Sequence, residues 1–232
     1  MFNSKYSKTL TVILIIVIIA IVGLLIYFGI DVYRKYYIQQ ASGDAVENFQ
    51  DEVNRIATLP VENTILNDVG PSVDLNTLYQ NTTSNDTTGG AHVQYMGYDM
   101  IGTIEIPATD IEYPIIADYD ASINSLNVAI VKLYPGTIAL NEVGNTVFAG
   151  HNYRNGTFFS NNKRLENGDK IYITGTDGQR VEYEVYNKYE TSTSDSDYMN
   201  RDTDGKREIS LTTCTDDTKR RLIIWAREVE EE

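Results

Sequence analysis

The 232-residue chain has a single cysteine and few basic residues, and each scarcity narrows what the protein can be. One cysteine cannot form an internal disulfide, so any part of the chain outside the cell is stabilised by packing alone. Nineteen lysines and arginines stand against 33 aspartates and glutamates, which gives a formal net charge of −14. Because no basic face is available to neutralise phosphates, we predict no nucleic-acid partner.

One long hydrophobic run is present, at residues 10–30, and it contains no charged side chain. As a helix it would span about 31 Å at roughly 1.5 Å per residue, which matches the hydrocarbon core of a bilayer. The run is longer than the apolar region of a signal peptide, and no small-x-small cleavage site precedes Asp31. We therefore predict an uncleaved, single-pass membrane anchor, with residues 1–9 inside the cell and the rest exported.

Three segments follow the predicted anchor. Residues 31–59 carry apolar side chains at three- and four-residue spacing, which predicts a helical stalk. Residues 60–94 are polar and predict a flexible linker, in which His92 is a solvated loop residue. Residues 95–232 alternate short strand-like runs with turn signals such as Asp177-Gly178. This pattern predicts a mainly β domain, an antiparallel barrel or sandwich.

The residue types needed for acyl transfer occur within the β-rich segment. Cys214 ends a strand-like run seven positions before Arg221, and His151 follows the apolar stretch 146–148. Together they can supply a nucleophile, a proton carrier and a stabiliser of the oxyanion. The alternative interpretations are a small buried cysteine, a structural histidine in a turn, and a solvated basic cluster.

Four segments, in this order along the chain, resemble the sortases, which are membrane-anchored cysteine transpeptidases of Gram-positive bacteria. Residues 101–107 are similar to the first barrel strand of the family, and residues 144–151 to the stretch that leads to its active-site histidine. Residues 210–214, Ser-Leu-Thr-Thr-Cys, resemble its Thr-Leu-x-Thr-Cys motif, and residues 221–226 the strand that begins with its essential arginine. The resemblance implies a closed antiparallel β-barrel of the sortase type with short helices.

The resemblance also implies catalytic roles for His151, Cys214 and Arg221, a two-step reaction and the partners of that reaction. Cys214 would cleave the Thr-Gly bond of a Leu-Pro-x-Thr-Gly-like sorting signal on a secreted protein and form a thioester. An amine of a peptidoglycan precursor or a pilin would then resolve the thioester. Two alternatives are a cysteine cell-wall peptidase and a non-catalytic, membrane-anchored adhesion module, which would need no such triad.

Features of two sortase subclasses are present. Residues 151–152 followed by 155–158 resemble class B enzymes, which carry a long helical insertion before the nucleophile strand. Only about 20 residues, from Glu190 to Ile209, are available for such an insertion here, so a class D-like or unclassified clostridial-type enzyme is an equal alternative. The second histidine that many sortases carry is absent from the comparable run, residues 131–136.

Arg220 competes with Arg221 for the role of oxyanion stabiliser. Side chains along a strand alternate between the two faces, so neighbouring arginines point to opposite sides and only one reaches Cys214. The spacing to Trp225-Ala226 resembles the family pattern with Arg221, which we therefore favour.

The resemblance also raises the question of calcium, because some class A sortases bind it and this chain has 33 aspartates and glutamates. The candidate oxygen ligands, which no compact loop gathers into an alternating pattern, are Glu105, Glu112, Asp118 and Asp120. We therefore interpret them as solvated surface charges and predict no cofactor or metal.

Overall fold

The computed structural model describes residues 4–58, 90–118, 121–136 and 139–230. The chain forms two compact units, Met1–Ala41 and Ser42–Glu232. Most of the predicted linker, residues 60–89, lies outside the described residues. Its last five residues belong to the β domain, where the Ala91 amide donates to the Thr176 carbonyl at 2.7 Å.

The segments interpreted as anchor and stalk lie in one continuous helix, α1, which spans Ser4–Ala57. Among the described residues, Thr9–Ala57 is the one helical stretch long and apolar enough to cross a membrane. Its apolar side chains between Leu10 and Ile30 are exposed. By length and composition this segment has the properties of a membrane anchor or a signal sequence.

The last four turns of α1 belong to the second unit and pack there through an apolar stripe. Phe49 is completely buried, and Val46 and Val53 are buried on the same face. The Ser42 hydroxyl is hydrogen-bonded to the Tyr95 hydroxyl at 3.0 Å. Each buried apolar side chain of this size contributes about 2 kcal/mol, so the stripe attaches this part of the helix to the β domain.

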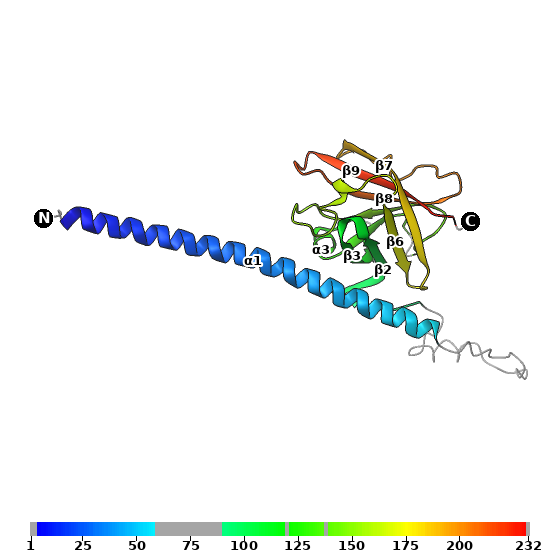
Figure 1. The fold of residues 1–232 in the computed structure, drawn as a ribbon, viewed down its shortest axis with the longest axis horizontal. Coiled ribbons are helices and arrows are strands. Elements are labelled where there is room, and N and C mark those ends of the chain that lie inside the picture. The colour runs from blue at the N-terminus through cyan, green and yellow to red at the C-terminus, as the bar shows by residue number, and fades with distance from the viewer. Residues whose placement is uncertain (1–3, 59–89, 119–120, 137–138, 231–232) are drawn as a thin grey trace, which may run out of the picture. The chain divides into compact units, whose positions relative to one another are not determined.

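Nine strands are seen in the described part of the β domain, and the last eight close into a barrel (Figure 1). The sheet order is β1-β2-β3-β4-β5-β8-β9-β7-β6, and an additional pairing of β2 with β6 closes the ring. The short helices are η1 (Pro107–Thr109), α3 (Ile123–Leu126) and η2 (Asn162–Arg164). The strands are β1 (Gln94–Tyr95), β2 (Tyr98–Ile106), β3 (Ile111–Ala117), β4 (Ile130–Tyr134), β5 (Gly144–Ala149), β6 (Lys170–Gly175), β7 (Arg180–Ser192), β8 (Arg207–Cys214) and β9 (Arg220–Glu228).

The predicted closed β-barrel is confirmed, but the expectation of a wholly antiparallel barrel is wrong for two pairings. β3 runs parallel to β4, and β5 runs parallel to β8. Parallel neighbours require a long crossover. The connection that contains α3 provides the first one, and the hairpin of β6 and β7 lies between β5 and β8 in the chain. Turn signals in the sequence mark where strands end, but they do not state which strands become neighbours.

The connection between β7 and β8, residues 193–206, contains turns and no helix. The long helical insertion expected of class B enzymes is therefore missing from this described segment. The connection is held down by contacts with the barrel. Tyr198 in its middle is buried in an apolar cluster with Val147 of β5 and Ile223 of β9.

Candidate active site

Strand register brings His151, Cys214 and Arg221 to one end of three adjacent strands. In the parallel pair of β5 and β8, Ala149 lies opposite Thr212, and the hydrogen bond from the Gly150 amide to the Thr212 carbonyl, at 3.2 Å, continues the pairing. In the antiparallel pair of β8 and β9, Cys214 lies opposite Arg221. Two residues beyond Ala149 and Thr212 stand His151 and Cys214. Residues distant in sequence are therefore brought to the same end of the sheet.

Side-chain alternation defines the face of the barrel that carries Cys214 and Arg221. We call it the site face, and residues of β5, β8 and β9 lie on it in rows. From the far end to the near end, the first three rows are Asn145-Glu208-Arg227, Val147-Ser210-Trp225 and Ala149-Thr212-Ile223. The fourth row, at the near end, is the pair Cys214-Arg221, and His151 stands in the segment that follows β5 at this end.

Arg221, and not Arg220, is the arginine at the sulfur. Nη1 of Arg221 donates a hydrogen bond to Sγ of Cys214 at 2.8 Å, and both side chains are half-buried. The Arg220 guanidinium instead contacts Glu190, donating to its carbonyl oxygen at 3.1 Å and lying 3.6 Å from its carboxylate. The two neighbouring arginines therefore point to different partners, as alternation along a strand requires.

Gly150 has no side chain, and this leaves room for the segment that contains His151. A Cβ added at Gly150 would lie 2.7 Å from Cδ1 of Ile130 and 2.8 Å from the Phe159 ring. The carbonyl of Gly150 accepts a hydrogen bond from the Thr213 hydroxyl at 2.7 Å. Gly150 thus lets the end of β5 approach both the core and β8, directly before the histidine.

His151 has one ring nitrogen that forms no hydrogen bond with the described residues. Within the described residues, its Nε2 atom is buried and has no hydrogen-bond partner. The ring packs 4.7 Å from the Tyr153 ring, whose hydroxyl donates to Asn127 Oδ1 at 2.6 Å. Burial, and then the positive charge of Arg221, lower the pKa of His151 below its ordinary value. The imidazole is therefore neutral at neutral pH and can accept a proton.

Asn152 connects the histidine segment to the cysteine strand. Its Nδ2 donates to the backbone carbonyl of Cys214 at 2.9 Å and to Oδ1 of Asp216 at 3.0 Å. Sequence reasoning noted Asn152 only as part of a subclass pattern. Its position directly after His151 was the available signal, but the partner 62 residues away is visible only in the fold.

A pocket of about 480 Å³ adjoins Cys214. It is mixed in charge: Lys163 pairs with Asp216 at 2.5 Å, and Lys188 donates to the Leu165 carbonyl at 2.6 Å. This volume is large enough to admit part of a peptide beside the sulfur. The lining residues are Asn152, Lys163, Lys188, Tyr189, Glu190, Cys214, Thr215, Asp216, Asp217, Arg220 and Leu222.

The carboxylates considered for calcium do not gather. Across the described ranges, no group of three or more His, Cys, Asp or Glu side chains could hold a metal ion. Glu105 pairs with Arg180 at 2.9 Å, and Asp118 accepts from the Ser122 hydroxyl at 2.7 Å. Asp120 lies outside the described residues. The other histidine, His92, is exposed.

Comparisons with known proteins point to one family. Residues 104–229, more than half of the chain, match the family model described as "Sortase domain". The pilus-related sortase C of Group B Streptococcus is 25% identical, with 56% of this chain and 68% of that chain covered and a TM-score of 0.51. No curated protein matches the chain.

Two further solved structures resemble this fold over most of its length. The Clostridium perfringens sortase D5 transpeptidase is 22% identical, with 82% of this chain and 99% of that chain covered and a TM-score of 0.55. Sortase A from Corynebacterium diphtheriae is 24% identical, with 82% and 85% covered and a TM-score of 0.52. At these identities the likeness concerns the fold.

Proposed function

The chain belongs to the sortase family of cysteine transpeptidases, and from this premise we propose that His151, Cys214 and Arg221 are its catalytic residues. The substrate is a Leu-Pro-x-Thr-Gly-like sorting signal, cleaved between Thr and Gly. The observation that carries the proposal is the 2.8 Å contact from Arg221 Nη1 to Cys214 Sγ, at the end of the site face where β5 delivers His151.

The first half-reaction forms a thioester. His151, neutral because its pKa is lowered, accepts the proton of the Cys214 thiol as sulfur attacks the threonine carbonyl carbon. The carbonyl electron pair moves to oxygen, and the Arg221 guanidinium, already a donor toward sulfur, stabilises the resulting oxyanion. The oxyanion then collapses and breaks the Thr-Gly bond. His151 returns its proton to the departing glycine amine.

The second half-reaction resolves the thioester with an amine. The amine nitrogen attacks the thioester carbonyl, His151 takes one of its protons, and collapse of the intermediate breaks the carbon–sulfur bond. The proton returns to the sulfur of Cys214, which restores the enzyme. The net change replaces one amide bond with another, so no oxidant, metal or cofactor enters the balance.

We propose that residues 10–30 anchor the protein as a single span, with residues 1–9 inside and the catalytic domain, residues 95–232, outside the cell. Residues 31–59 serve as the stalk and residues 60–94 as the linker. This placement is supported by the apolar helix, and it gives Cys214 access to secreted proteins. The acceptor is an amine of a peptidoglycan precursor or a pilin, and the likeness to the pilus-related sortase C supports the second.

The test is intact-mass spectrometry of the full-length chain in detergent micelles, incubated with peptides that vary each position of Leu-Pro-x-Thr-Gly. We expect an acyl adduct with one peptide series, and its conversion by an added amine into a transpeptidation product. Cys214→Ala is the matched control and should show no adduct. If the wild-type thiol reacts with iodoacetamide but forms no adduct with any peptide, the proposed substrate is wrong.

A further inference from the structure

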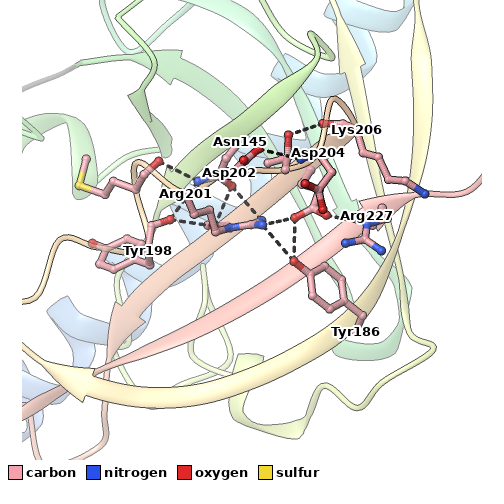
Figure 2. A network of polar contacts seen from close by, with 12 residues as sticks. Asn145, Tyr186, Tyr198, Arg201, Asp202, Asp204, Lys206 and Arg227 are labelled. Atoms are coloured by element: carbon pink, nitrogen blue, oxygen red, sulfur yellow. Dashed lines mark hydrogen bonds and ion pairs between the residues drawn. The ribbon is translucent and has the colours of Figure 1, made fainter.

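A buried polar network lies at the end of the site face opposite Cys214 and Arg221 (Figure 2). Its centre is Glu208 on β8, whose side chain is completely buried. One carboxylate oxygen accepts from Nε of Arg227 at 2.6 Å, and the other accepts from the Tyr186 hydroxyl at 2.7 Å and from Nη1 of Arg201. The carboxylate is thus surrounded by three donors from three segments of the chain.

Arg201 carries this network into the connection between β7 and β8. In Figure 2 it lies between Tyr186 and Asn145, and its Nη2 donates to Asn145 Oδ1 at 3.1 Å. Nδ2 of Asn145 in turn donates to the carbonyls of Tyr198 and Met199, each at 2.9 Å. The guanidinium carbon of Arg201 also lies 4.6 Å from the Trp225 ring centroid. Side-chain contacts therefore hold the backbone of this connection against the site face.

Burying charged groups in this way adds little to the net free energy of folding, because their desolvation offsets much of their attraction. Burial raises the pKa of Glu208, but hydrogen bonds from a tyrosine and two arginines outweigh it and hold the pKa below its ordinary value. Removing the Glu208 and Arg201 side chains from water costs several kcal/mol per ion before their attraction is counted, and well-packed apolar side chains are often as stabilising. What the network provides in addition is a defined position for the connection that Arg201 belongs to.

The position of the connection between β7 and β8 affects the near end of the site face, because residues of this connection pack close to that end. Tyr198 packs on Val147 and Ile223, and Ile223 follows Arg221 by two residues on the same face of β9. Two residues along a strand correspond to about 7 Å. Tyr189 packs against the same cluster and also lines the pocket that adjoins Cys214. We call Tyr198 and Met199 the Tyr198–Met199 wall, because they support the cluster on this side of the pocket.

We infer that Arg201 and Glu208 are positioning residues that hold the Tyr198–Met199 wall in place for peptide binding. The inference rests on the proposed function, because it assumes a peptide on the site face. Neither residue touches the reacting atoms, since they lie three rows away from Cys214. Their loss should affect recognition of the peptide, and not the reactivity of the sulfur.

Arg201→Met and Arg201→Lys in the full-length chain test this inference, with Arg207→Met as the matched control. Arg207 precedes Glu208 on β8 and forms its own ion pair with Glu228 at 2.6 Å. Three quantities are measured for each protein: hydrogen exchange of residues 193–206, KM and kcat for the sorting peptide, and the alkylation rate of Cys214 by iodoacetamide.

We expect Arg201→Met to accelerate exchange of residues 193–206 and to raise the peptide KM about tenfold, the effect of roughly 1.4 kcal/mol. The alkylation rate should stay within about twofold of wild type, as expected for a residue that does not act on the sulfur. Arg201→Lys keeps a charge for Glu208 but loses the fork that also reaches Asn145, so it should show a smaller rise in KM. Arg207→Met should change neither exchange in this segment nor KM.

Two results would overturn the inference. Unchanged exchange in both Arg201 variants would show that the network does not hold the connection, whatever reaction the enzyme performs. Faster exchange with an unchanged KM, or with alkylation falling in parallel, would show that the wall does not act through peptide binding. Failure of the proposed function is distinguishable, because wild type itself would then form no adduct with any peptide.

Discussion

The two ends of the site face use the same kinds of side chain in opposite ways. At the far end, the carboxylate of Glu208 accepts three hydrogen bonds and is sealed from solvent. At the near end, within the part of the chain the structure describes, Nε2 of His151 is buried without a partner and Arg221 donates to a sulfur. Polar groups whose hydrogen bonds are all made within the protein stabilise its structure. Polar groups that have no such partner can bind a substrate or transfer a proton.

The comparison is sharpened most by removing the nucleophile. Cys214→Ala should abolish peptide turnover, while the melting temperature of the full-length chain in micelles changes by less than about 2 °C, because a half-buried thiol contributes little to packing. Turnover is followed by chromatography of the peptide products, and melting by circular dichroism. A large loss of stability together with residual turnover would contradict the catalytic assignment.

Replacing each of the two neighbouring arginines in turn tests which one acts at Cys214, and the expected effect is the next largest. Arg221→Met removes the donor beside Sγ, so kcat should fall by about 10²- to 10³-fold. Arg220→Met removes a contact with Glu190 and should lower kcat by less than about tenfold. Steady-state kinetics with the same peptide measures both variants. If Arg220→Met has the larger effect, the two arginines have been assigned in the wrong order.

At the far end we expect the reverse pattern, a loss of stability without a loss of sulfur reactivity. Glu208→Gln leaves two arginines without their buried carboxylate, so the free energy of unfolding should fall by about 3 kcal/mol. Alkylation of Cys214 should be unchanged in the folded variant. The control, Glu228→Gln, removes a partly exposed pair with Arg207 and should cost about 1 kcal/mol or less. Equal costs in the two variants would mean that burial of Glu208 is unimportant.

Two adjacent threonines in the middle of the sheet offer a smaller contrast. Among the described residues, the buried Thr212 hydroxyl has no hydrogen-bond partner, whereas the Thr213 hydroxyl donates to the Gly150 carbonyl at 2.7 Å. Thr212→Val should therefore raise the free energy of unfolding by up to about 1 kcal/mol, and Thr213→Val should lower it by about 1–2 kcal/mol. Denaturant titration of both variants decides this, and shifts of the same sign would contradict the two environments.

The smallest effect concerns the pH dependence of stability. The folded-state pKa of His151 is lowered by burial and then by Arg221, whereas the unfolded value is about 6.5. The unfolded chain therefore binds the proton at higher pH, so stability is lost as the pH falls from about 6.5 through the folded-state pKa. His151→Asn should lose less melting temperature than wild type between about pH 7 and pH 5. Parallel curves for wild type and His151→Asn would argue against the shift.

Sequence reasoning reached the barrel but not its connectivity. The strand that contains Val131 was not predicted, and both parallel pairings were missed. A strand in a parallel pair takes its neighbour from a distant part of the chain, and periodicity carries no information about that choice. The polar network around Glu208 was missed for the same reason, because an isolated glutamate in a strand pattern has no visible partner.

The sequence by itself determined the apolar segment, the alternation of strands and turns, and the identity of the residues that can perform acyl transfer, because these depend on composition and short-range spacing. Only the tertiary structure decided that the segment of His151 and the strand of Cys214, 63 residues apart, end on the same side of the sheet, and that Arg221 contacts the sulfur while Arg220 contacts Glu190. Both arrangements follow from the register of β5, β8 and β9. That register is set by hydrogen bonds between strands that are remote in sequence, so it exists only once the barrel has closed.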